Sequence, residues 1–126
     1  MSANHNRQKI RVISHNCAKS TNATLSILET ASDTADIVLI QEPWIGRDRE
    51  TGDVITVSHP SFQRLLPASS PDNRKARTMA YISNTYPNLQ ATLRSDLSTD
   101  SDLQIIEIST PSLPSVLLCN IYNEAG

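Results

Sequence analysis

The most constraining feature of the chain is the apolar run at residues 37–40, which is followed at once by Gln41, Glu42 and Pro43. Four consecutive apolar residues without polar alternation predict a short strand that is buried on both faces. Pro43 has no backbone N–H to donate, so we expect the strand to end before it. A carboxylate at the end of a buried strand can be held rigidly and still reach solvent or a metal ion. We therefore take Glu42 as the chemical centre of the chain.

The segment before this run predicts a β-α-β unit. A first strand is expected at residues 10–14. Ser20 or Thr21 can cap a helix that ends near residues 32–34. The apolar stripe of this helix is expected to comprise Leu25, Leu28 and Ala31, with Ile27 beside it. A strand, a helix and a second strand within about 35 residues have the size of one such unit.

The remainder of the 126-residue chain predicts short strands separated by turns. Residues 45–59 are charged and rich in turn formers, and we expect them to form a long exposed loop. Further strands are predicted at 61–66, 78–83, 89–93, 103–108 and 116–122. One helix with a succession of short strands favours an α+β fold with a largely antiparallel sheet.

Composition excludes several classes of protein. The formal net charge is -2, so no overall field draws the chain to nucleic acid. The two cysteines, Cys17 and Cys119, form no CxxC pair, and we expect both to be buried, reduced thiols. We find no signal peptide and no apolar run of membrane-spanning length. We therefore expect an intracellular protein that is not secreted and has no membrane partner, and a nuclear location is compatible with this expectation.

Three of the predicted strands carry polar side chains at their ends. These side chains are Asn16, Glu42, and the pair Asn120 and Tyr122. If these strand ends converge, they bring together a carboxylate, an amide and a phenol. Such oxygen ligands suit Mg²⁺, which takes one or two protein carboxylates and completes its shell with water and a substrate phosphate. From spacing alone, a hydrated strand end is the simpler interpretation of Glu42, because strand ends are ordinarily polar.

Four segments carry a likeness to a known family. They are 12–16 (VISHN), 36–44 (DIVLIQEPW), 77–82 (RTMAYI) and 119–123 (CNIYN). In this order they resemble the N-terminal half of the endonuclease/exonuclease/phosphatase family. The likeness is greatest to the apurinic-endonuclease-like domains of non-LTR (LINE-type) retrotransposons, and the HPSF stretch at 59–62 is similar to fungal elements of that kind. It covers residues 10–123, and Gln-Glu-Pro-Trp at 41–44 is its most specific part.

The resemblance implies a four-layered α/β sandwich, in which two β-sheets pack together between helices. It also implies a hydrolase that cleaves DNA phosphodiester bonds with Mg²⁺ or Mn²⁺. In such a site Glu42 would bind the metal. Asn16 and Tyr122 would contact the substrate phosphate.

The chain departs from the family after its tyrosine motif, and it also lacks the glycine pair that many members have before the strand predicted at 78–83. The Asp/Asn and Asp-His residues that complete the family's site belong to its second half, and the usual proline after the tyrosine motif is missing at 123–125. We therefore expect residues 1–8 to be a flexible tail and residues 9–126 to be the first half of the domain. The second sheet would then be absent or incomplete, and an apolar sheet face would be exposed.

A basic cluster and several isolated side chains invite functional interpretations. Arg74, Lys75 and Arg77 could contact a DNA backbone, although a solvated loop is the simpler interpretation of such charges. Trp44 is expected to anchor its loop against the core, and contact with DNA is the less favoured alternative. The histidines His15 and His59 are expected to be packing or turn residues rather than catalysts.

Three hypotheses about function follow. The first is a fragment of a retrotransposon-type, metal-dependent endonuclease that acts on DNA when complete. The second is a catalytically inactive remnant or an interaction module, which pairs with another chain through the exposed sheet. The third is an unrelated α/β binding domain, which we rank last because the chain has neither GxGxxG nor GxxxxGK[ST].

Overall fold

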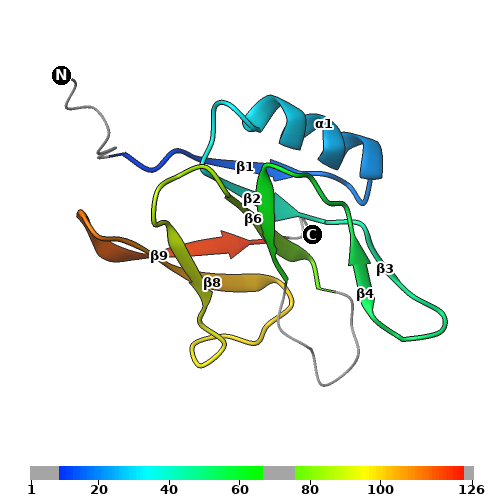
Figure 1. Ribbon diagram of the computed structural model, residues 1–126. Helices are drawn as coiled ribbons and strands as arrows, with labels where there is room; N and C mark the ends of the chain where they lie inside the picture. Colours follow the sequence, from blue (N-terminus) through cyan, green and yellow to red (C-terminus); the bar gives the residue numbers. More distant parts are fainter. Residues whose placement is uncertain (1–8, 67–75, 124–126) are drawn as a thin grey trace.

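A computed structural model of the chain describes residues 9–66 and 76–123. It has an α+β fold with one helix and mostly antiparallel strands within these ranges, as predicted (Figure 1). The expected tail at 1–8 and the basic residues Arg74 and Lys75 lie outside the described residues. Within the described ranges, no helix combines the length and the apolarity that crossing a bilayer requires.

The elements follow one another in the order β1 (Val12–Asn16), α1 (Thr21–Ala31), β2 (Ile37–Gln41), β3 (Ile45–Arg47), β4 (Val54–Thr56), β5 (Phe62–Leu65), β6 (Thr78–Ser83), β7 (Gln90–Leu93), β8 (Leu103–Thr110) and β9 (Leu113–Ile121). The strands form a four-stranded sheet, a three-stranded sheet and a hairpin. The four-stranded sheet has the order β1-β2-β6-β5, and only its β1–β2 pair is parallel. The three-stranded sheet has the order β7-β8-β9, and β3 pairs with β4.

The run at 37–40 lies at the centre of the molecule and is buried on both faces, as predicted. Val38 and Ile40 pack into a core beneath α1, whereas Ile37 and Leu39 pack into a second core shared with β8. Because successive side chains of a strand point to opposite faces, one short run contributes to both cores. The molecule thus has three layers within the described residues, namely α1, the four-stranded sheet and the three-stranded sheet (Figure 1).

The helix confirms the predicted cap but corrects the predicted stripe. The Ser20 hydroxyl accepts a hydrogen bond from the Ala23 N–H at 3.0 Å, which satisfies one free donor of the first turn. Leu28 is buried as expected, but Leu25 is 40% exposed. Thr24 is buried in its place, because its hydroxyl can donate to the Ser20 carbonyl at 2.8 Å.

Three further predictions are wrong. The segment 45–59 is not a long loop, since it contains the β3–β4 hairpin, which projects to the right in Figure 1. Cys17 is buried, but Cys119 is exposed, because it lies on the outer face of the edge strand β9. Trp44 is not buried in the core but is 37% exposed.

Candidate functional site

The backbone of Glu42 is held from two sides directly after β2. Its N–H donates to the Arg77 carbonyl at 2.9 Å, and its carbonyl accepts from the Lys19 N–H at 2.7 Å. The φ angle of Glu42 is 51°, in the left-handed region that non-glycine residues rarely adopt. Such a conformation persists where the surroundings impose it, and it often marks a functional position. The two backbone hydrogen bonds supply that constraint here.

Tyr122 brings the end of β9 to the same place. Its hydroxyl donates to Glu42 Oε1 at 2.9 Å across 80 residues of sequence. Its backbone N–H donates to the Asp102 carbonyl at 2.9 Å, and the Arg77 guanidinium lies 5.1 Å from the centre of its ring. The predicted meeting of Glu42 and Tyr122 therefore occurs.

Arg77 is a member of this group and not a solvated loop residue. Its Nε atom lies 2.9 Å from Asp102 Oδ1, and its side chain is 28% exposed. The oxygen lies off the direction of the N–H, so the contact is an ion pair and not a hydrogen bond. This charge contact ties β6 to the turn before β8 and positions Arg77 beside the tyrosine.

A cavity of about 270 Å³ opens in front of Glu42. Its walls come from the loop before α1, from the start of β3 and from the segment before β6. They are Lys19, Glu42, Pro43, Trp44, Ile45, Ala76 and Arg77. The cavity thus has a carboxylate, two cations and an aromatic ring around one space.

Asn120 has a different role from the one its neighbourhood in sequence suggested. It is 1% exposed and lies between the two sheets. Its amide nitrogen donates to the carbonyls of Met79 at 2.9 Å and Ile40 at 3.2 Å, and it also lies 3.3 Å from Gln104 Oε1. Its amide oxygen accepts from Gln41 Nε2 at 2.8 Å. Asn120 is therefore a buried link behind the cavity and does not line it.

Asn16 lies at the end of β1, paired in register with Gln41. Its side-chain oxygen accepts from the Ala18 N–H at 2.9 Å, so it shapes the turn that leads to Lys19. No hydrogen bond joins Asn16 to Glu42 or Tyr122 in the described part of the chain. Asn16 therefore lies at the predicted edge of the sheet but is not joined directly to the other two side chains.

The surroundings of Cys17 and His59 agree with the structural roles that the sequence predicted for them. Burial raises the pKa of the Cys17 thiol, so this side chain stays protonated near neutral pH and is a poor nucleophile. The His59 Nδ1 atom accepts from the Ser61 N–H at 3.1 Å, which confirms it as a turn residue.

Among the described residues that line the cavity, Glu42 is the only carboxylate. Its Oε2 atom makes no hydrogen bond to the residues described. No group of three His, Cys, Asp or Glu side chains suited to a metal occurs within 9–66 and 76–123. The single carboxylate of Glu42 fits a cation such as Mg²⁺, which can be held by one carboxylate together with water and a substrate phosphate.

Lys19 and Asp102 are the site residues that sequence reasoning missed. Lys19 enters through a turn in which both Ala18 and Lys19 have positive φ angles, of 49° and 59°. Neither alanine nor lysine is a residue type that predicts a turn with positive φ angles, so the sequence carries no signal for it.

Comparison of the chain with protein-family models, with curated proteins and with solved structures finds no match.

Proposed function

We propose that the Glu42 cavity is the metal- and phosphate-binding part of a phosphodiester hydrolase acting on DNA. We further propose that the two packed sheets belong to the four-layered sandwich of the endonuclease/exonuclease/phosphatase family. The observation that carries the proposal is the 2.9 Å hydrogen bond from the Tyr122 hydroxyl to Glu42 Oε1 at the edge of a cavity that also contains Lys19 and Arg77.

The chemistry of these side chains supports the proposal. Glu42 would hold a Mg²⁺ or Mn²⁺ ion through its second carboxylate oxygen, with Tyr122 fixing the orientation of the first. A divalent cation at this place polarises a phosphate and stabilises a leaving oxygen. Lys19 lines the same cavity and supplies a positive charge, which would attract a phosphate oxygen. Asn16 shapes the turn that places Lys19 there.

The first test is cation binding. Addition of Mn²⁺ below one equivalent should broaden the amide NMR signals of Gln41, Glu42, Trp44 and Lys19, because a paramagnetic ion relaxes nearby nuclei. Glu42→Gln keeps the shape of the side chain and removes its charge, so the broadening there should disappear. Magnesium-dependent nicking of supercoiled plasmid, where it is detected, should also disappear in this variant.

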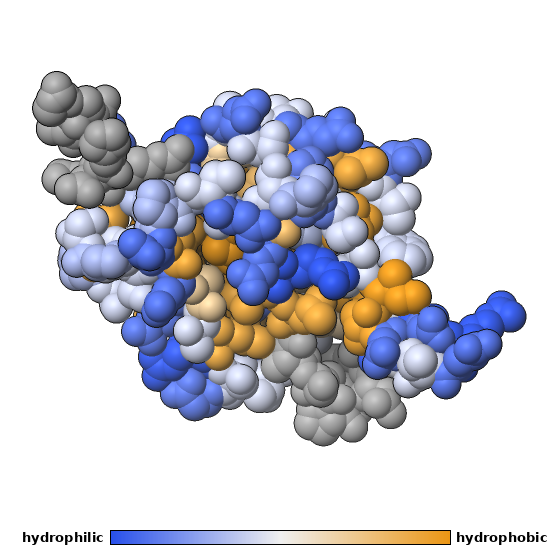
Figure 2. Space-filling model, viewed as in Figure 1, coloured by the Kyte–Doolittle hydropathy of each residue, from blue (hydrophilic) through white to orange (hydrophobic). Residues whose placement is uncertain are grey.

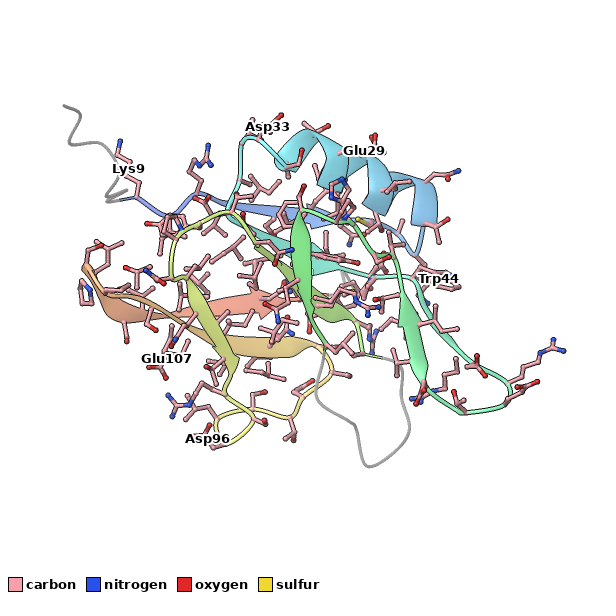
Figure 3. All side chains as sticks on the ribbon, in the orientation of Figure 1. Lys9, Glu29, Asp33, Trp44, Asp96 and Glu107 are labelled. Carbon is pink, nitrogen blue, oxygen red and sulfur yellow. The ribbon has the colours of Figure 1, made fainter. Side chains whose placement is uncertain are left out.

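Glu29→Gln is the matched control, because Glu29 is an exposed carboxylate on α1 (Figure 3). It should leave both the broadening and any nicking unchanged. Broadening that is scattered over surface carboxylates, or that is the same in Glu42→Gln as in the natural chain, would refute the proposed metal site.

An interaction module is the second candidate function, and one observation favours it. β9 is an edge strand among the described residues, and its outer face leaves Leu117 52% and Ile121 59% exposed. Exposed apolar strands of this kind pair readily with another chain.

A further inference from the structure

The cavity at Glu42 has an aromatic wall that the proposed hydrolysis does not use. Trp44 is the only tryptophan of the chain, and it lies in the wall of the cavity with 37% of its surface exposed. Large aromatic side chains are mostly buried, so an indole left open at a cavity offers its surface to a ligand. Figure 2 shows other apolar side chains at the surface on this side, near the base of the β3–β4 hairpin.

The Trp44 indole packs against the backbone of Gly46. A Cβ atom at Gly46 would lie 2.8 Å from Cη2 and 3.1 Å from Cζ2 of Trp44. The six-membered ring therefore packs directly on the backbone of β3, which only glycine permits at this distance. A ring held in this way is already immobile, so a ligand that stacks on it costs the Trp44 side chain little additional conformational entropy.

Lys19 is the cation best placed for a phosphate next to this indole ring. Its ammonium group forms no ion pair and no hydrogen bond within the described residues, while its backbone N–H is held by the Glu42 carbonyl at 2.7 Å. The charge of Arg77 is in part neutralised by Asp102. Without a metal ion, the negative charge of Glu42 repels an anion in the cavity. The effect of this repulsion on the binding affinity can be measured.

We propose that the cavity binds one unpaired nucleotide of a single strand, with its base stacked on Trp44 and its phosphate beside Lys19. The inference rests on the proposed function, because it names the substrate of the same site. Pockets for drug-sized ligands have about 300–1,000 Å³, so a cavity of about 270 Å³ suits one base and its phosphate. A base within a duplex is stacked on its neighbours and cannot offer its face to the indole.

The intrinsic fluorescence of the chain tests this directly, because its tryptophan signal comes from Trp44 alone. In EDTA, oligothymidylate of about ten nucleotides should quench this fluorescence in a saturable way. The same oligonucleotide in a duplex should bind at least about tenfold more weakly, because its bases are not free. Inorganic polyphosphate, which has charge but no base, should not quench.

Matched variants separate stacking from charge. Trp44→Leu should weaken binding of a fluorescein-labelled oligonucleotide by about 5- to 150-fold, which corresponds to the loss of one stacked base. Lys19→Gln should weaken it severalfold, whereas Lys9→Gln should not. Lys9 is exposed and lies at the opposite side of the molecule from Trp44 (Figure 3).

The behaviour of Glu42→Gln keeps the two proposals distinct. In EDTA this variant should bind the oligonucleotide as tightly as the natural chain or more tightly, because a negative charge next to the phosphate is removed. Equal quenching by duplex or by polyphosphate, or unchanged binding in Trp44→Leu, would overturn the stacking proposal. A failure of Mn²⁺ to bind at Glu42 would overturn the metal site and leave the nucleotide site standing.

Discussion

At the scale of single residues, Tyr81 links ionisation to stability. Its ring lies fully buried in the core beneath α1, and its hydroxyl donates to the Val57 carbonyl. Burial raises the pKa of Tyr81 to about 12, whereas tyrosine in an unfolded chain titrates near 10. Between these values the unfolded state loses its proton while the folded state keeps it. The contribution of Tyr81 to stability is therefore complete below about pH 10 and is lost as the pH rises towards 12.

We expect the free energy of unfolding to fall by up to about 2 kcal/mol more in the natural chain than in Tyr81→Phe over this range. Urea unfolding at several pH values from 8 to 11.5, followed by the fluorescence of Trp44, measures the difference. Lysine titration affects both proteins alike, so their comparison isolates the tyrosine. Parallel pH curves for the two proteins would contradict the assignment.

Individual site residues differed in how well the sequence indicated them. Glu42 could be found because an apolar run and a proline mark the end of its strand. Tyr122 could be found only through its place after another strand and through resemblance. Lys19 and Asp102 could not be found, because turn geometry positions them and their residue types do not encode that geometry.

At the scale of elements, the outer face of the three-stranded sheet is an unusual surface. Register places Leu103 beside Ile121, Ile105 beside Cys119 and Glu107 beside Leu117. These positions alternate with Gln104, Ile106 and Ile108, which are buried between the sheets. The part of this face formed by β8 and β9 is apolar except for Glu107, and it has no covering layer in the described residues, which favours association.

We expect the natural chain to self-associate as its concentration rises, and Leu117→Glu with Ile121→Lys to shift it towards the monomer. Both side chains are more than half exposed, so the substitutions should leave the fold intact. Sedimentation velocity measures the association. Leu97→Lys is the control, because Leu97 is 49% exposed outside the strands. If the double variant associates like this control, the β9 face is not the contact.

The elements themselves were predicted where the pattern was long or capped. The Ser20 cap identified the start of α1, and the uninterrupted run identified β2. The β3–β4 hairpin was missed because its strands have only three residues each, too few to show alternation among the charges around them. The first strand was placed two residues early, at 10–14 and not at Val12–Asn16, because strand ends follow pairing with β2.

At the scale of the whole molecule, a polar network joins the two sheets directly behind the cavity. Asn120 from β9 contacts the backbones of β2 and β6, and it accepts from Gln41, the residue before Glu42. Gln41 also donates to the Ser14 hydroxyl at 2.8 Å. Polar groups between packed sheets are costly unless they are bonded, so this network specifies how the sheets are aligned. The alignment in turn brings Tyr122 to Glu42.

Asn120→Leu removes these bonds and nearly conserves the volume of the side chain. The variant leaves Gln41 short of one partner and the bonded carbonyls without the amide, so we expect a loss of about 3 kcal/mol in the free energy of unfolding. Asn123→Leu changes an exposed residue three positions later and should alter stability by less than about 0.5 kcal/mol. Urea unfolding compares the two variants. Relative to the natural chain, amide exchange in the Asn120 variant should accelerate more in β9 than in β1, because contact between the sheets is weakened at the end of β9. Equal stability of the two variants would show that apolar packing alone aligns the sheets.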